Sequence, residues 1–322
     1  MAEEYIYATA RIHTNESHLL NFNDIEQLVA CRGFDEAVKL LADKGFGALK
    51  SFDDYEQMLE AENLRTWALI AELYDDLSVF DALRLPADFH NLKAAIKAVC
   101  TDTEPDKIFL CGGIWDGKFI YNAVLNQEIF RLPEYMQKCA KEAKDAVIKL
   151  HDGQLCDIII DKALLEAMIK AAQKSNCDVL KQYVQLYTAQ SDIKIAVRGI
   201  KTYKSAQFFD KALAECDLLD KDMLKNAALG GLDDLCEYLK TTQFSGAADC
   251  LAQSLCAFEK YCDNLLISSI LPQKYNSFTL GPAVAYILAR ENEIKAVRMV
   301  LCAKKNDLPQ ELVQERLRDM YV

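Results

Sequence analysis

Apolar residues recur along most of this chain with the three- to four-residue spacing of amphipathic helices. The spacing is clearest in 55–83, 161–189, 249–271 and 282–304. Side chains at positions i, i+3, i+4 and i+7 share one face of a helix, so each segment is predicted to be a long helix with one buried stripe. Helix breakers are few, with 12 glycines and 6 prolines among 322 residues, and Pro309 is predicted to open a last short helix. The pattern therefore predicts an all-α fold.

One short motif recurs three times in the predicted helices. It occupies residues 91–97, 192–198 and 293–298. The lysines of the motif, Lys93, Lys194 and Lys295, are separated by 101 residues in both intervals. Self-similarity at a fixed period indicates that one structural unit is repeated along the chain.

Gly33 and Gly231 mark a second correspondence, because they stand 198 residues apart, close to two repeat lengths. Each glycine separates two predicted short helices, and two acidic residues open the second of them, where they suit the positive end of a helix. We therefore predict three sequence-related helical repeats, arranged around a pseudo-three-fold axis. Their predicted boundaries are 1–105, 106–206 and 207–322, the last with a C-terminal helix.

Composition and charge are those of an ordinary globular protein of the cytoplasm. Hydrophobic residues make up 51% of the chain, charged residues 27%, and the formal net charge is −12. Nucleic acid and anionic lipid headgroups are therefore not expected as general partners. The first residues carry acids without an apolar signal-peptide core, and no apolar run reaches the ~18 residues of a membrane span. We expect a location on the cytoplasmic side, with the 12 cysteines as buried thiols.

Three features resemble chemical sites, but each has a better structural interpretation. Residues 112–118 match G-x-x-x-x-G-K, yet Phe119 stands where a phosphate-binding loop needs a hydroxyl for magnesium. Three cysteines within 250–262 are spaced by six residues, so they point to different faces of a helix and form no close ligand pair. His90 is predicted to be a helix-start or packing residue rather than a base. We therefore predict no catalytic residue, no cofactor and no metal.

Basic residues on the three repeated motifs are the candidate partner-binding positions. They are Lys93, Lys97, Lys194, Arg198, Lys295 and Arg298. Spacings of three or four residues keep each pair on one helix face, away from the apolar stripe. In an acidic chain these pairs are expected to attract acidic groups of a partner. The alternative is a solvated helix face or local ion pairs with Asp and Glu.

Several segments resemble those of a known family. They are residues 5–12, 86–93, 281–282, 287–295, 308–309 and 315–322. Through these segments the chain resembles the C subunit of V/A-type ATPases, called d in eukaryotes, from its first helix to its last residue. The C-terminal segment is the most specific, and 106–190 matches least distinctly.

The resemblance implies a three-lobed helical funnel seated on the cytoplasmic face of a membrane rotor ring. The central shaft, subunits D and F, would plug into the funnel, so that torque passes between the catalytic head and the proteolipid ring. The chain would then be a non-catalytic coupler in proton or sodium transport and ATP synthesis or hydrolysis. The residues alone leave a second hypothesis open, a helical-repeat scaffold of another cytoplasmic complex. Repeats of 101 residues are longer than the 20–45 residues of usual solenoid units, which weakens that hypothesis.

Overall fold

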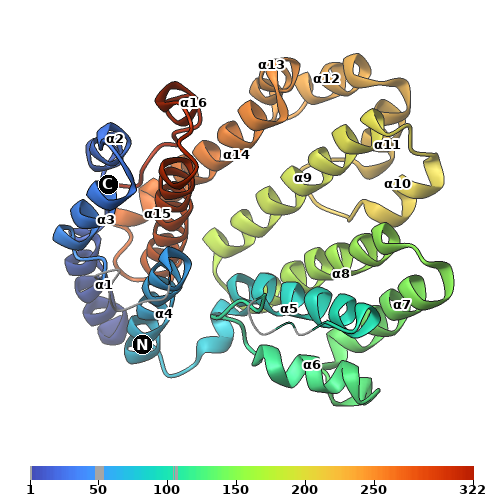
Figure 1. Ribbon diagram of the computed structural model, residues 1–322, viewed down its shortest axis with the longest axis horizontal. Coiled ribbons are helices and arrows are strands. Elements are labelled where there is room, and N and C mark those ends of the chain that lie inside the picture. Colours follow the sequence, from blue (N-terminus) through green and yellow to red (C-terminus); the bar gives the residue numbers. More distant parts are fainter. Residues whose placement is uncertain (1, 48–53, 104, 106–107) are drawn as a thin grey trace. The chain divides into compact units, whose positions relative to one another are not determined.

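The computed structural model describes residues 2–47, 54–103, 105 and 108–322 of the chain. In this part of the chain the regular elements are helices, apart from one isolated bridge between Cys216 and Leu219. The prediction of an all-α fold is therefore confirmed (Figure 1).

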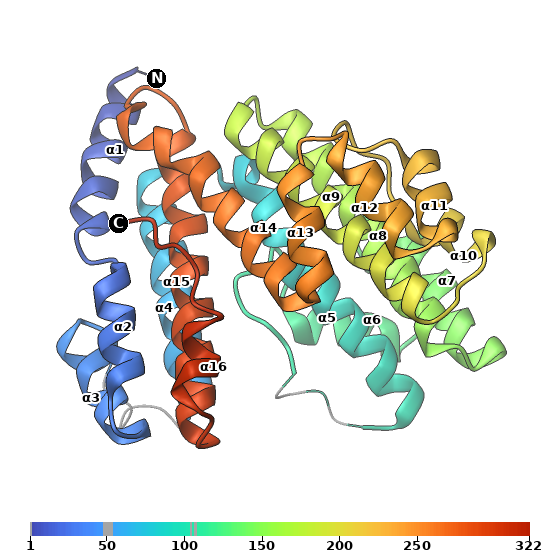
Figure 2. The ribbon, with the colours of Figure 1, turned by 90° about the horizontal axis from the view of Figure 1, so that it is seen from above.

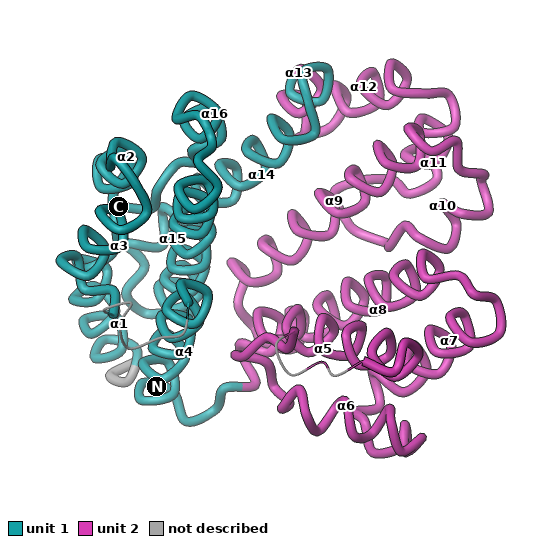
Figure 3. The backbone as a smooth tube through the Cα atoms, in the orientation of Figure 1, with its two compact units in different colours: residues 1–77, 250–322 teal, residues 78–249 magenta. Residues whose placement is uncertain are grey.

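The helices fall into two compact units, residues 1–77 with 250–322 and residues 78–249 (Figure 3). The first unit contains α1 (Ala2–Glu16), α2 (Phe22–Ala30), α3 (Phe34–Asp43), α4 (Tyr55–Leu73), α14 (Leu255–Ile270), η4 (Leu271–Tyr275), α15 (Gly281–Lys305) and α16 (Gln310–Gln314). The second contains α5 (Asp81–Thr101), α6 (Gly117–Leu125), η3 (Ile129–Arg131), α7 (Glu134–Leu150), α8 (Gly153–Lys174), α9 (Asp178–Lys201), α10 (Ala206–Ala212), α11 (Lys221–Gly230) and α12 (Leu232–Lys240). The short elements η2 (Leu77–Phe80) and α13 (Ser245–Gln253) span the boundaries.

This division by packing differs from the predicted division into three repeats, which was made by sequence similarity. The repeat boundaries and the pseudo-three-fold arrangement stay predictions. The boundary predicted between residues 105 and 106 also adjoins residues outside the described ranges.

Polar side chains fix where many of the helices begin. Each accepts a hydrogen bond from a backbone N–H in the first turn of the helix that follows it, which otherwise lacks a partner. These capping residues are Asn21, Asp54, Asp116, Asp152, Asp220 and Ser254. A cap of this kind contributes about 1 kcal/mol to stability, so the sequence itself sets these starting points.

Three of the four predicted long helices are interrupted. The segment 55–83 contains the end of α4, because Tyr74 takes an extended conformation with φ −135° and ψ 123°. The segment 161–189 is broken between α8 and α9 at Asn176, whose φ is 53°, and asparagine tolerates this left-handed conformation. Ser254 caps α14 within 249–271. The fourth segment is the single helix α15, and Pro309 precedes α16 as predicted.

Helix α15 is central to the first unit. It packs against α1, α2, α3, α4 and α16, and Figures 1 and 2 both show it beside α4. Val297 and Leu301 of α15 are buried in one cluster with Leu28, Leu41 and Met58. Burial of each such side chain contributes about 2 kcal/mol, so this cluster holds the N-terminal and C-terminal segments of the chain together.

The long helices pack against short helices in a recurring manner. In the second unit α5 contacts the short helix α6, and α9 contacts the short helices α10 and α11, so both long helices meet short helices that follow them in the chain. In the first unit α15 contacts α2 and α3, which lie near the start of the sequence.

Candidate interaction site on the repeated long helices

One buried polar position recurs on the three long helices. Asn91 of α5, Asp192 of α9 and Glu293 of α15 each stand two residues before a repeated lysine. Their exposed fractions are 0%, 2% and 0%, so all three side chains are inside the protein. Buried polar groups are stable only with hydrogen-bond partners, and each of these three holds the backbone of a loop that precedes a short helix.

In the first case Asn91 binds both polar groups of one loop residue. Its side-chain oxygen accepts a hydrogen bond from the backbone N–H of Leu110 at 2.8 Å, and its Nδ2 donates to the carbonyl of Leu110 at 2.9 Å. The loop leads into α6. The amide thus attaches the loop to α5 without placing a charge in the interior.

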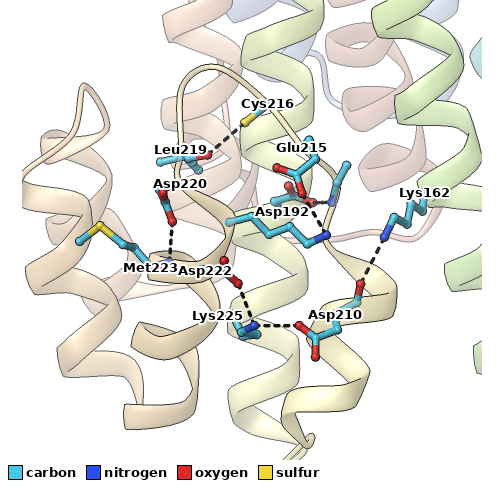
Figure 4. A network of polar contacts seen from close by, with 12 residues as sticks. Lys162, Asp192, Asp210, Glu215, Cys216, Leu219, Asp220, Asp222, Met223 and Lys225 are labelled. Carbon is cyan, nitrogen blue, oxygen red and sulfur yellow. Dashed lines mark hydrogen bonds and ion pairs between the residues drawn. The ribbon is translucent and has the colours of Figure 1, made fainter.

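In the second case Asp192 accepts a hydrogen bond from the backbone N–H of Ala214 at 3.2 Å, in the loop that leads into α11. Burial raises the pKa of Asp192 to about 7, although this N–H and the cations Lys221 and Lys162 act in the opposite direction. Glu215 raises it further. Figure 4 shows Asp192 next to Glu215, within a network of carboxylates and ammonium groups. This anchor therefore titrates, in contrast to Asn91.

In the third case Glu293 accepts a hydrogen bond from the backbone N–H of Leu20 at 2.5 Å, in the loop that leads into α2. Burial raises the pKa of Glu293 to about 7, and the guanidinium of Arg290, which forms an ion pair with it, counteracts the rise. The side chain of Arg290 is itself 9% exposed. The same position thus serves the same purpose in three helices, with an amide, an aspartate and a glutamate.

The ends of the long helices also recur. Asp102, Tyr203 and Asp307 follow α5, α9 and α15, and their φ angles are 52°, 52° and 50°. In each case the next backbone N–H donates to the carbonyl five residues before it, at 3.1, 3.0 and 3.0 Å. This is the Schellman arrangement of a left-handed helix cap. The same geometry also follows α6, where Gln127 has a φ of 60° and the N–H of Glu128 donates to the carbonyl of Ala123 at 2.8 Å. Of the two recurrences, only the buried anchors therefore support the hypothesis of three repeats.

Three of the six predicted partner-binding residues form ion pairs within their own unit. Nζ of Lys93 lies 2.5 Å from a carboxylate oxygen of Asp161, and Lys97 pairs with Asp157 at 2.6 Å. Both acids belong to α8. Arg298 pairs in the same way with Glu56 of α4, at 2.9 Å. The alternative of local ion pairs therefore describes these three side chains.

The other three predicted residues have no ion pair with any residue that the structure describes. Lys194 is half-buried on α9, while Arg198 of α9 and Lys295 of α15 are exposed. Helix α9 is thus the repeated helix on which neither member of the basic pair has an acidic partner among the described residues. Its cations remain the best candidates for contact with another molecule.

The loop that matches a phosphate-binding motif is fastened to α5. The backbone N–H of Trp115 donates to buried Asp88 at 3.0 Å, and Arg84 donates to the carbonyl of Gly113 at 2.6 Å. Asp116 accepts hydrogen bonds from the first amides of α6, at 2.9 and 3.1 Å. A phosphate loop directs such amides at its anion, whereas here carboxylates of the protein already accept them. The loop is therefore a connection between α5 and α6.

Metal sites and membrane-spanning helices are both absent from the residues that the structure describes. No group of three or more His, Cys, Asp or Glu side chains is placed to hold a metal ion within the described ranges. No helix there combines the length and the apolar character that a membrane span requires. All twelve cysteines are free thiols.

Three curated proteins resemble the chain over most of its length. The C subunit of the V-type sodium ATPase of Enterococcus hirae is 22% identical over 325 residues, which cover 99% of each chain. The C subunit of the A-type ATP synthase of Methanocaldococcus jannaschii is 22% identical over 350 residues, covering 97% of this chain and 86% of its own. Its counterpart in Halorubrum lacusprofundi, also the C subunit of an A-type ATP synthase, is 23% identical and covers 71% of this chain and 70% of its own.

A family model gives the same result. The model of the ATP synthase (C/AC39) subunit matches residues 8–316, and the match contains all three long helices with their anchors and caps. The family is a non-catalytic subunit of the ATP synthase and ATPase complex. The chain therefore belongs to the ATP synthase (C/AC39) subunit family.

Proposed function

We propose that this chain couples the central shaft of a V/A-type ATPase to the proteolipid ring in the membrane. The observation that carries the proposal is the family match over residues 8–316. The relatives named above support it, since two of them cover 97% or more of this chain and are C subunits of a V-type sodium ATPase and an A-type ATP synthase.

In this function the chain is a mechanical part of the rotor. Subunits D and F of the shaft bind on one side and the ring on the other, so the chain is peripheral to the membrane on its cytoplasmic face. Torque transfer requires a body that does not deform under load. The buried anchors and the caps support such stiffness, because each one fixes a loop to a long helix without relying on apolar contacts alone.

The basic residues of the long helices are the proposed contacts with acidic groups of the partners. Lys93, Lys97 and Arg298 already form ion pairs with acidic residues of this chain. Each of these pairs would have to break before the cation could bind a partner. Lys295 interacts electrostatically with Glu291, four residues before it on α15, whereas Lys194 and Arg198 have no ion pair to break with any residue that the structure describes. We therefore place the stronger electrostatic contribution on Lys194 and Arg198.

Association with the two rotor components tests this function. The purified chain is mixed separately with detergent-solubilised ring and with the D–F shaft, and binding is measured by light scattering or calorimetry. We expect binding to both components and no hydrolysis of Mg-ATP by the chain alone. Binding to neither would contradict the coupler function and favour the second hypothesis, a helical-repeat scaffold of another complex.

A further inference from the structure

One cavity lies wholly within the first unit, and residues of α4 and α15 form part of its wall. Its volume is about 260 Å³, which is smaller than the roughly 300–1,000 Å³ of pockets for drug-sized ligands. Helix α15 packs against both α1 and α4 (Figure 2), so the wall is built from helices that hold one another in place. The cavity therefore has the size of a site for a small molecule or an ion.

The described side chains that line this cavity carry more positive than negative charge. They include the cations of Lys44, Arg65 and Arg290, and a single carboxylate, that of Glu62. The chain has a net charge of −12, but exposed charges farther away than about 8 Å are largely screened at physiological ionic strength. A small ion in the cavity therefore interacts chiefly with the lining, which favours an anion.

The carboxyl groups that pair with these cations reduce the positive charge only in part. Asp24 pairs with Lys44 at 2.5 Å and Glu293 pairs with Arg290, but neither acid belongs to the described lining. Burial raises the pKa of Glu62, and burial raises the pKa of Glu293 to about 7. Both glutamates can therefore take up a proton when an anion binds beside them.

Arg290 retains hydrogen-bond donors that the described residues do not use. It is 7% exposed, and a guanidinium carries several N–H donors. Nη1 donates to Glu293 and Nη2 donates to the hydroxyl of Tyr286 at 3.4 Å, while Nε has no hydrogen-bond partner within the described ranges. A buried donor without an acceptor is costly, so a ligand that offers several acceptor oxygens is stabilised beside this side chain.

Arg65 and Lys44 place positive charge on the solvent side of the cavity. Their side chains are 61% and 37% exposed, whereas Glu62 and Tyr286 are each 2% exposed. Arg65 is held in place, because Nη1 donates to the carbonyl of Gly45 at 3.2 Å and Nη2 lies 3.2 Å from a carboxylate oxygen of Glu62. The two exposed cations therefore lie where an anion would enter from water.

We propose that this cavity binds a free tetrahedral oxyanion of the size of sulfate or phosphate, with Lys44, Arg65 and Arg290 as its ligands. The three cations come from different segments, since Lys44 directly follows α3, Arg65 lies on α4 and Arg290 on α15. A tetrahedral anion directs oxygens to several sides at once and so suits this arrangement better than a carboxylate, whose two oxygens lie in one plane. The bound ion links these segments and stabilises the first unit. This site goes beyond the proposed function and does not depend on it.

Calorimetric titration of the wild-type chain with sodium sulfate, at constant ionic strength, tests the site. Sulfate keeps its charge near neutral pH, so titration of the probe itself does not contribute. We expect saturable binding by the wild type, and we expect Arg65→Gln to weaken it about tenfold, because a charge-assisted hydrogen bond is lost. The side chain of Arg65 is mostly in water, so this variant is expected to fold. Absence of saturable binding by the wild type, or equal affinity in both proteins, would overturn the proposal.

Glu62→Gln tests the sign of the charge that the cavity accepts. The variant removes the carboxylate from the described lining and keeps a side chain of nearly the same shape. We expect it to bind sulfate about fivefold more tightly than the wild type, because one repulsive charge beside the anion is gone. Weaker binding of sulfate by this variant would contradict a site for an anion.

Arg131→Gln is the matched control in the second unit. Arg131 pairs with Glu128, three residues before it, and its side chain is 54% exposed, much as Arg65 pairs with Glu62. We expect this variant to bind sulfate like the wild type. An equal loss in both arginine variants would overturn the proposal, because any loss of positive charge would then weaken binding. The control also accounts for the general stabilisation of folded proteins by sulfate when melting temperatures are compared with and without the salt.

Association with the rotor components separates a free ion from an acidic group of a partner. Sulfate binding is measured on the chain alone, so its outcome does not depend on whether the chain binds a ring or a shaft. We expect Arg65→Gln to associate with the ring and with the D–F shaft as the wild type does. Association that is lost in this variant would assign the cavity to an acidic side chain of a partner and overturn the proposal of a free ion.

Discussion

Single buried residues decide how the loops of this protein are attached. Asn91, Asp192 and Glu293 occupy the same position of a repeated helix, yet they differ in charge. The amide is neutral at every pH, while burial raises the pKa of each carboxyl group to about 7. The loop before α6 is therefore held by a pH-independent contact, and the loops before α11 and α2 by contacts that titrate.

Asp192 makes the unfolding free energy depend on pH with a definite sign. Its pKa is about 7 in the folded chain and about 3.9 when unfolded, so between these values the folded chain holds a proton that the unfolded chain has released. Stability contributed by this group is full below about pH 4 and is lost as pH rises towards 7. We predict that, in the Asp192→Asn variant, the free energy of unfolding falls less steeply with rising pH, by about 1 kcal/mol per pH unit.

Urea denaturation of both proteins at several values between about pH 5 and pH 7 measures this slope. Asparagine keeps an oxygen for the N–H of Ala214, as Asn91 does for Leu110, so the variant is expected to fold. Glu293 titrates in both proteins and cancels in the comparison. Identical slopes would contradict the assignment of this pKa to Asp192.

At the scale of elements, a long helix and the loop that it anchors form the recurring unit. Side chains of α5 that include Arg84, Asp88 and Asn91 hold the loop before α6 at several points. The anchored loops lead into the short helices α6, α11 and α2, so the anchors fix the loop before each short helix to its long helix. Rigid attachment of this kind suits a protein whose proposed task is to transmit torque.

Asn91→Ala tests how much this attachment contributes. It leaves the N–H and the carbonyl of Leu110 without their partner, and an unsatisfied buried group costs about 1–3 kcal/mol. We predict a loss of about 2 kcal/mol in the free energy of unfolding. The matched control is Asn122→Ala on the exposed face of α6, for which we expect a change within about 0.5 kcal/mol. Equal effects in urea denaturation would show that the Asn91 contact is not a stabilising anchor.

The sequence predicted these elements only in part. Periodicity indicates the long helices, but apolar positions continue across the breaks at Tyr74 and Asn176, so the breaks are hidden in the pattern. The 101-residue spacing aligned Asn91 with Asp192 and Glu293, and a shared polar residue in that register was the available signal. Its burial depends on tertiary packing, which periodicity alone does not specify.

The ion pairs of the basic residues could not be predicted from the sequence either. Lys93 pairs with Asp161, 68 residues away, and Arg298 with Glu56, 242 residues away. Such pairs follow from which helices pack together. The left-handed cap at Tyr203 could not be predicted from the sequence either, because this conformation normally favours glycine or asparagine.

For the whole molecule, family membership is the observation that supports the proposed function. The family match spans residues 8–316, and the anchors and caps recur on the three long helices within that range. The chemistry of ATP belongs to other subunits of the complex in this account. In the proposed function, this chain contributes a helical body that binds the shaft and the ring.

Ion pumping by a rotary complex assembled with and without this chain tests the coupling function most directly. Without the chain, we predict that the catalytic head still hydrolyses ATP while proton or sodium uptake into vesicles is absent. Addition of the purified chain is expected to restore uptake driven by ATP. Uptake of equal rate in its absence, or hydrolysis of ATP by the chain alone, would contradict the account.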